Sequence, residues 1–171
     1  MLVDGTDLVS WANRRDAQGL LPQLLRRLVH GTVERASRVG FPAGEGIQLG
    51  GWDGIVVCEQ ANAFVPDGSS AWELGTNRDV KAKADGDYNK RRRDPRGIDP
   101  ARSTFVFVTP RRWGSKDEWA AARQGEGVWR EVRAYDADDL EAWLELAPAV
   151  DRKSTRLNSS HSRASRMPSS A

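Results

Sequence analysis

Two acidic residues near the middle of the chain have the types and the spacing of a metal site. Asp53 lies in the motif GWDG, and Glu73 lies 20 positions later in the motif WELGT. Between them, the segment PDGS has the residue types of a tight turn, so the two motifs are expected to lie on neighbouring strands. Two converging carboxylates are the ligands that a hard divalent cation such as Mg²⁺ or Mn²⁺ prefers.

Two lysines follow the second acidic motif in the sequence. Lys81 and Lys83 lie in a polar stretch that predicts a helix. Two residues span about 200° around a helix, so only one of them can face the acids, and the sequence leaves the choice open. The alternative is a solvated helix face on which the pairs Asp79–Lys83 and Asp87–Arg91 stabilise the helix.

The alternation of side chains along a strand also places two tryptophans. If Asp53 and Glu73 share one face of the sheet, then Trp52 and Trp72 are expected on the opposite face, where they would hold the acids rigidly. Further oxygen ligands could come from the chain on either side of the predicted strands. The candidates are Glu45 as a metal ligand, and Gln23 and Glu34 as outer ligands.

The elements that must position these residues alternate in type. Leucines at three- and four-residue spacing predict a helix over 7–38, which Gly19 and Pro22 can split. The remaining pattern predicts strands at 40–51, 54–59, 70–76, 104–109 and 129–135, and helices at 77–93, 116–124 (with Ser115 as a possible N-cap) and 138–146 (with a capping box of Asp138 and Glu141). A three-strand meander followed by strand–helix alternation predicts an α/β protein, more closely an α+β mixed sheet with helices on both faces.

Composition excludes several classes of protein. The chain has 171 residues with one cysteine, Cys58, and two histidines, His30 and His161, which excludes a disulfide framework and a zinc site built from Cys and His. No run approaches the roughly 20 apolar residues that span a membrane. No catalytic Ser/His/Asp triad or phosphate-binding glycine loop is evident. We therefore expect a cytoplasmic protein without membrane contact.

The last 21 residues, 151–171, are expected to lie outside the folded domain, 1–150. They lack aromatic residues and periodicity, which predicts disorder. The strings DRKSTRLNSSH and SRMPSSA resemble the translation of a sequencing-library adapter, so we expect a natural chain that continues differently after Val150. The segment holds five of the 26 basic residues and one of the 24 acidic ones. The body is therefore slightly acidic, and its charge alone does not favour nucleic acid.

Clusters of arginine are the local features that favour DNA. The candidate phosphate contacts are Arg91 and Arg92 in the run KRRR, and Arg111 and Arg112 before Trp113. The alternative is that these charges simply solvate the surface.

The acidic motifs resemble the PD-(D/E)xK restriction-endonuclease-like family. The strings GGWDG, NAFVPDGSSAWELGT, KAKADGDY, STFVFVTPRRW and VRAYDADDLEAWL are similar to one prokaryotic branch, over residues 20–147. The resemblance implies an αβββαβ core, Mg²⁺ ligation by Asp53 and Glu73, and a lysine two residues after the Glu. Gly75 occupies that position here. In some branches the lysine has moved to the next helix, where Lys81 or Lys83 could serve.

The resemblance implies a Mg²⁺-dependent endonuclease that hydrolyses phosphodiester bonds in DNA, as one domain of a larger prokaryotic, defence-type protein. The expected partners are DNA, fused domains and, as an option, a second copy of the chain in a homodimer. Gly75 favours the alternative, a catalytically degenerate nuclease fold that binds nucleic acid or regulates a partner. A third hypothesis is a domain that binds only proteins.

Overall fold

The computed structural model describes residues 3–42 and 51–147. The candidate ligand Glu45 and the segment 151–171 lie outside these residues, as does most of the strand predicted at 40–51. The described chain forms one mixed sheet with helices packed on both faces, so the predicted α+β class is confirmed.

The sheet contains five strands in the order β1–β2–β3–β4–β5. These are β1 (Ala36–Gly40), β2 (Gly54–Cys58), β3 (Gly68–Leu74), β4 (Ser103–Val108) and β5 (Glu131–Tyr135). The first three strands form an antiparallel meander, and β3, β4 and β5 are parallel. Since β2 begins where β3 ends, with Gly54 opposite Trp72, the residues just before β2 lie beside the end of β3.

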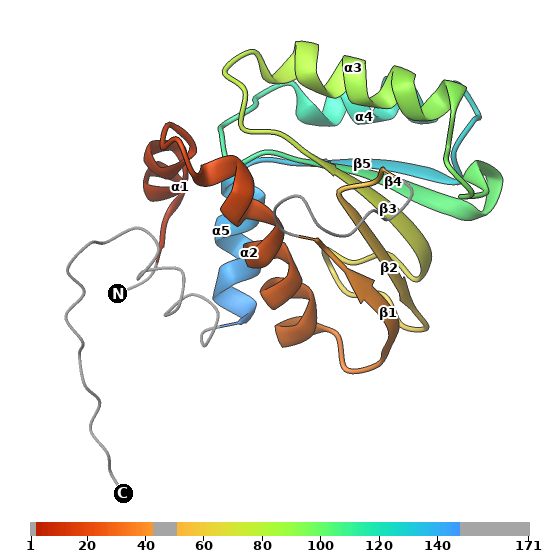
Figure 1. Ribbon diagram of the computed structural model, residues 1–171, viewed down its shortest axis with the longest axis horizontal. Helices are drawn as coiled ribbons and strands as arrows, with labels where there is room; N and C mark the ends of the chain where they lie inside the picture. The colour runs from red at the N-terminus through yellow and green to blue at the C-terminus, as the bar shows by residue number, and fades with distance from the viewer. Residues whose placement is uncertain (1–2, 43–50, 148–171) are drawn as a thin grey trace, which may run out of the picture.

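Helices cover the two faces unequally, as Figure 1 shows. α3 (Val80–Arg93) and α4 (Lys116–Gln124) lie on one face, which we call the α3 face. On the other lie α1 (Gly5–Ala12), α2 (Ala17–Thr32) and α5 (Ala137–Leu146), and the short 3₁₀ turn Pro100–Arg102 precedes β4. Among the helices that the structure describes, none has both the length and the apolar character to cross a membrane.

Strand alternation divides the core into two layers. In β3, Trp72 and Leu74 are fully buried in the layer under α2 and α5, while Ala71 packs in the layer under α3. Glu73 lies between Trp72 and Leu74, so its side chain points to the α3 face. The carboxylate is therefore placed against a helix rather than in open solvent.

The N-terminal helix is shorter and divided differently from the prediction of one helix over 7–38. The chain leaves the helix at Asn13 and re-enters it at Ala17, so the polar segment NRRD makes the break and Pro22 lies inside α2. The helix ends at Thr32, and the first strand of the described residues is Ala36–Gly40. The regular leucine spacing ends at Val29, one turn before the end of α2, and Val33, which also packs against this core, is already the extended C-cap residue.

Two predicted helix caps also differ. The capping box of α5 consists of Asp136 and Asp139 rather than Asp138 and Glu141, and Glu141 instead accepts a hydrogen bond from the Gly5 N–H. Ser115 stands at the N-cap of α4 but makes no capping bond with its side chain. The remaining elements lie within a few residues of their predicted bounds.

Candidate functional site

Asp53 and Glu73 meet at the end of β3, as the hairpin predicts. Asp53 Oδ2 accepts a hydrogen bond from the Leu74 N–H at 2.9 Å, and the Asp53 N–H donates to the Trp72 carbonyl at 3.1 Å. Asp53 thus binds the backbone on both sides of Glu73. These two bonds fix its carboxyl group beside that of Glu73 on the α3 face.

Glu73 is buried, whereas Asp53 beside it is half-buried. Glu73 is only 2% exposed. Burial, followed by the hydrogen bond and negative charge of Asp53, raises the pKa of Glu73 to about 8, while Arg91 acts in the opposite direction. Two like charges in a place poor in water resist joint ionisation, so in the absence of a further cation the site holds a proton near neutral pH.

Trp52 lies on the same face as the acids, so the prediction that it shares the opposite face with Trp72 is wrong. Trp72 belongs to the core layer under α2 and α5, whereas Trp52 packs edge-on against Phe105 and Trp129 under the α3 face. The chain bends at Asp53, before β2 begins. Because alternation holds only along a regular strand, the bend brings Trp52 to the side of Glu73.

One stripe of α3 faces the acids. Lys83, Asp87 and Arg91 follow one another at four-residue spacing, which places them on one side of the helix. Lys83 Nζ contacts Asp87 Oδ1 at 3.1 Å, and Asp87 is only 5% exposed. Burial raises the pKa of Asp87, against the opposing effect of the Lys83 ammonium, and the charge of Asp53 adds to the rise. The second oxygen, Asp87 Oδ2, is buried without a hydrogen-bond partner.

The structure distinguishes the two candidate lysines. Lys81 pairs with Asp85 at 2.8 Å, and its side chain is 66% exposed. Lys83 is 30% exposed and lies in the stripe beside the acids. The predicted pair Asp79–Lys83 is not formed, because the Asp79 side chain caps the start of α3.

The stem of Lys83 occupies the space beside Gly75. A Cβ atom added at Gly75 would lie 2.7 Å from Lys83 Cγ, 3.2 Å from Lys83 Cε and 3.3 Å from Phe107 Cζ. Because real Cβ atoms almost never approach another heavy atom that closely, a side chain at position 75 would collide with Lys83 where it now lies. Lys83 can therefore take this position only because residue 75 has no side chain.

Arg91 is a member of the site rather than of the surface, contrary to its predicted role as a phosphate contact. The residue is 3% exposed, and its Nε donates to Glu73 Oε1. Its Nη2 donates to the Gly51 carbonyl, and the guanidinium lies 4.6 Å from the centre of the Trp52 ring. Arg91 makes these contacts in place of the predicted ion pair with Asp87, which pairs with Lys83 instead. In the sequence, Arg91 is one of a run of four basic residues, and nothing in that run marks it as buried.

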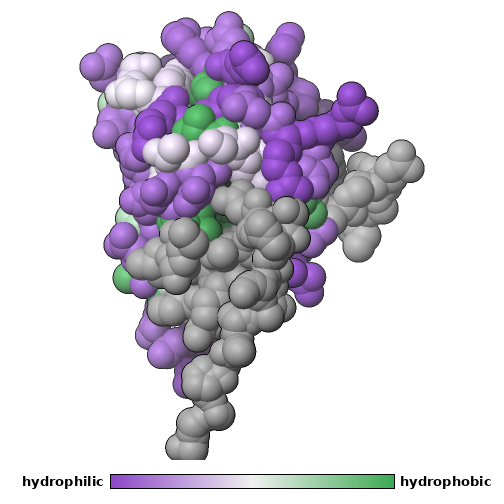
Figure 2. All heavy atoms as spheres, turned by 90° about the vertical axis from the view of Figure 1, so that its left-hand side faces the viewer, coloured by the Kyte–Doolittle hydropathy of each residue, from purple (hydrophilic) through white to green (hydrophobic). Residues whose placement is uncertain are grey.

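The other predicted DNA contacts occupy different settings. Arg92 has a side chain 52% exposed and lies 3.4 Å from Glu126. Arg111 donates from Nε to the Thr76 carbonyl at 2.6 Å and also bonds α1, so it ties the end of β4 to neighbouring elements. Arg112 is 55% exposed and lies 3.5 Å from Asp138. The side of the molecule in Figure 2, where α3 and α4 form the upper layer, is mainly hydrophilic.

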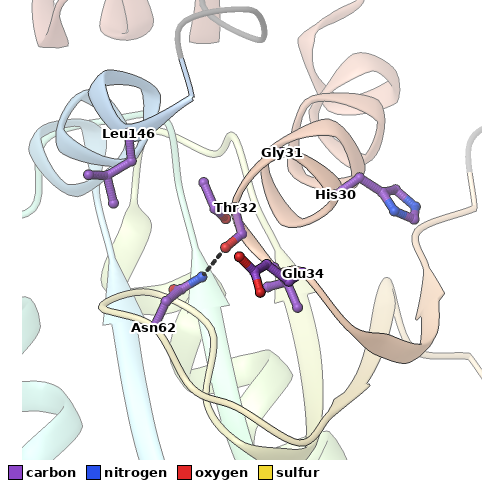
Figure 3. Close-up of a pocket in the computed structure, with 7 residues that line it drawn as sticks. His30, Gly31, Thr32, Glu34, Asn62 and Leu146 are labelled. Carbon is purple, nitrogen blue, oxygen red and sulfur yellow. Dashed lines mark hydrogen bonds between the residues drawn. The ribbon is translucent and has the colours of Figure 1, made fainter.

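A separate pocket lies at the C-terminal end of α2, away from both acids. Its volume is about 460 Å³, and Asn62 Nδ2 donates to the Thr32 carbonyl at its wall (Figure 3). Glu34, predicted as an outer ligand, lines this pocket, and Gln23 lies on α2, which covers the opposite face from Glu73. His30 is exposed at the pocket rim rather than held in the core. We assign neither Glu34 nor Gln23 to the acidic site.

Within residues 3–42 and 51–147, no group of three or more His, Cys, Asp or Glu side chains is arranged to hold a metal ion. At the acidic site the structure brings together the carboxyl groups of Asp53 and Glu73. Comparison of the chain with protein-family models, with curated proteins and with solved structures finds no match.

The raised pKa of Glu73 predicts how the free energy of unfolding depends on pH when a chelator such as EDTA keeps metal ions away. The folded state holds a proton that the unfolded chain releases near 4.5, so the protonated form favours folding. This stabilisation, on the order of a few kcal/mol, is complete below about pH 4.5 and is lost as pH rises to about 8. Urea denaturation between pH 5 and 8 should show a steeper loss in wild type than in Glu73→Gln. Glu145→Gln, at an exposed carboxylate, is the matched control, and parallel curves for all three would contradict the expectation.

Proposed function

We propose that this chain is a metal-dependent nuclease domain that hydrolyses phosphodiester bonds in DNA through a PD-(D/E)xK-type site. The observation that supports the proposal is the position of the Lys83 side chain, which fills the space beside Gly75. The lysine that the motif requires is missing from the strand, but the stem of Lys83 crosses the same place from α3.

The two acids suit a divalent cation. Asp53 and Glu73 supply hard carboxylate oxygens from adjoining backbone segments, and a cation between them would relieve the repulsion that keeps a proton on Glu73. A bound Mg²⁺ or Mn²⁺ supplies an activated water and stabilises negative charge on the reacting phosphate.

The residues of the chain have separate tasks in this scheme. Asp53 and Glu73 hold the cation, and the bonds from Asp53 to the backbone keep the two carboxyl groups in register. Lys83 presents its ammonium group toward the phosphate and orients the attacking water. Asp87 directs that ammonium group through the 3.1 Å contact. Exposed basic side chains such as Arg92 and Arg112 contact the DNA backbone.

One observation favours a second function, a degenerate nuclease fold that binds nucleic acid or regulates a partner. Arg91 already places a positive charge against Glu73, where a catalytic site would hold its metal. A guanidinium in that place could preserve the fold after loss of catalysis. In either case, we propose that the domain belongs to a larger cytoplasmic, prokaryotic protein of the defence type, with a homodimer as an option.

The test is cleavage of supercoiled and linear duplex DNA in Mg²⁺ or Mn²⁺, with EDTA as the control. Wild type should cleave, and Asp53→Ala and Glu73→Ala should not. Equal cleavage by all three proteins would contradict the proposed site. DNA binding that weakens with salt and survives in both variants, without cleavage by wild type, would support the degenerate fold. Neither cleavage nor binding at low salt would leave the protein-binding hypothesis.

A further inference from the structure

Arg91 occupies an unusual place for the last turn of a polar helix. The neighbouring residues Arg92 and Arg93 face solvent, but Arg91 turns under the helix and is 3% exposed. A buried guanidinium loses its hydration, and this cost is recovered only when each of its donors meets a well-placed acceptor. The acceptors of Arg91 therefore indicate what it does.

The guanidinium joins the two segments that carry the acids. Its Nε bonds Glu73 on β3, and its Nη2 bonds the carbonyl of Gly51, two residues before Asp53. Its flat face lies on Trp52, the residue between these two points of the turn. The guanidinium of Arg91 thus contacts the side chain of Glu73 and the backbone that leads into Asp53.

Gly51 is shaped for this contact. Its φ angle is +85°, a conformation that side-chain-bearing residues rarely adopt, and an added Cβ would lie 3.4 Å from both Arg91 Nη atoms. The turn therefore exposes its carbonyl to the guanidinium at close range. Arginine can bond two separate acceptors because its donors lie in a fixed plane, whereas the single ammonium group of lysine cannot span the same two sites.

We infer that Arg91 is a positioning residue that sets the separation of Asp53 and Glu73 by clamping the Gly51–Asp53 turn against the end of β3. The clamp consists of the contacts of Arg91 with Glu73 and Gly51. Its consequence for cation affinity rests on the proposed function.

The amide proton of Leu74 reports on the clamp directly, because it donates to Asp53 Oδ2. Hydrogen exchange, followed by NMR on the full chain in EDTA, would compare wild type with Arg91→Lys and with Arg93→Lys, at an exposed residue of the same turn, as the matched control. In Arg91→Lys, exchange at Leu74 and Asp53 should be about tenfold faster, while exchange at Phe105 in β4 should be unchanged. An unchanged rate at Leu74 in a folded Arg91→Lys protein would overturn the inference.

Cation binding gives the second arm, with Mn²⁺ as the probe in calorimetry. Arg91→Lys should bind Mn²⁺ roughly tenfold more weakly than wild type, and Arg93→Lys should bind it equally well. Unchanged or tighter binding in Arg91→Lys would overturn the inference, since Arg91 would then only neutralise or compete. If wild type binds no Mn²⁺, the proposed nuclease function fails, while the exchange rates at Leu74 still decide whether Arg91 positions the turn.

Discussion

Replacement of Lys83 by methionine is expected to lower the rate of DNA cleavage by about 10²- to 10⁴-fold, the usual range for loss of a residue that handles a proton or charge at the reacting group. Methionine keeps an unbranched stem beside Gly75, so the space there stays filled. The substitution keeps the stem but removes the ammonium group and its 3.1 Å contact with the buried Asp87. The fold should remain intact by circular dichroism, with a lower thermal midpoint because Asp87 loses an ion-pair partner.

Lys81→Met is the matched control, since Lys81 lies two residues away on the same helix. Its ion pair with Asp85 is exposed, and such pairs contribute only up to about 1 kcal/mol to stability. Cleavage by Lys81→Met should therefore stay near the wild-type rate. Single-turnover cleavage of duplex DNA in saturating Mn²⁺ is the appropriate measurement, because it separates the chemical step from binding. Equal losses in the two variants would show that α3 contributes only general positive charge.

The acidic pair could be predicted from sequence because local signals determine it. The turn residues between Asp53 and Glu73 specify a hairpin, and a hairpin brings residues at the base of its two strands together. The mixed sheet followed in the same way from the meander and the alternating strands and helices. In each case the decisive contacts are those of backbone elements close in the chain.

Trp52 shows where this reasoning fails. Strict alternation of side chains between the two faces predicts its position only if an unbroken strand runs through residue 53. The bend at Asp53 and the positive φ of Gly51 are set by contacts with Arg91 and by the pairing with Trp72, and neither is visible in a window of a few residues. The face on which Trp52 lies therefore depends on contacts between distant parts of the chain.

The roles of Lys83 and Arg91 depend on which side of α3 meets the sheet. The apolar signal in this helix is short: Val80, Ala84 and Tyr88 recur at four-residue spacing and are buried against the sheet. This signal does not show that Arg91, in the last turn, is buried as well. A charge run such as KRRR gives the same pattern whether its members are solvated or one of them is buried. The choice is made by the buried acceptors Glu73 and Gly51, which belong to other parts of the chain.

A relocation of the lysine is the sharpest test of the relation between Gly75 and Lys83. The double variant Gly75→Lys with Lys83→Ala is expected to cleave DNA at least about tenfold faster than Lys83→Ala alone, which is a coupling of about 1.4 kcal/mol or more. Position 75 follows Glu73 by two residues, so a side chain there points to the same face of the strand. Lys83→Ala removes the Cγ and Cε atoms that lie 2.7 Å and 3.2 Å from the new Cβ.

The single variant Gly75→Lys should behave in the opposite way. With Lys83 in place, the new side chain meets its stem and the ring of Phe107, so one of them must move, and overpacking of this kind usually costs about 1–3 kcal/mol. Gly75→Lys should thus lower the thermal midpoint, and Lys83→Ala should restore part of the loss. The four proteins form a double-mutant cycle measured for both cleavage and stability. Recovery of stability without recovery of cleavage would mean that Lys83 fills the space beside Gly75 for packing alone, which would favour the degenerate fold over the nuclease.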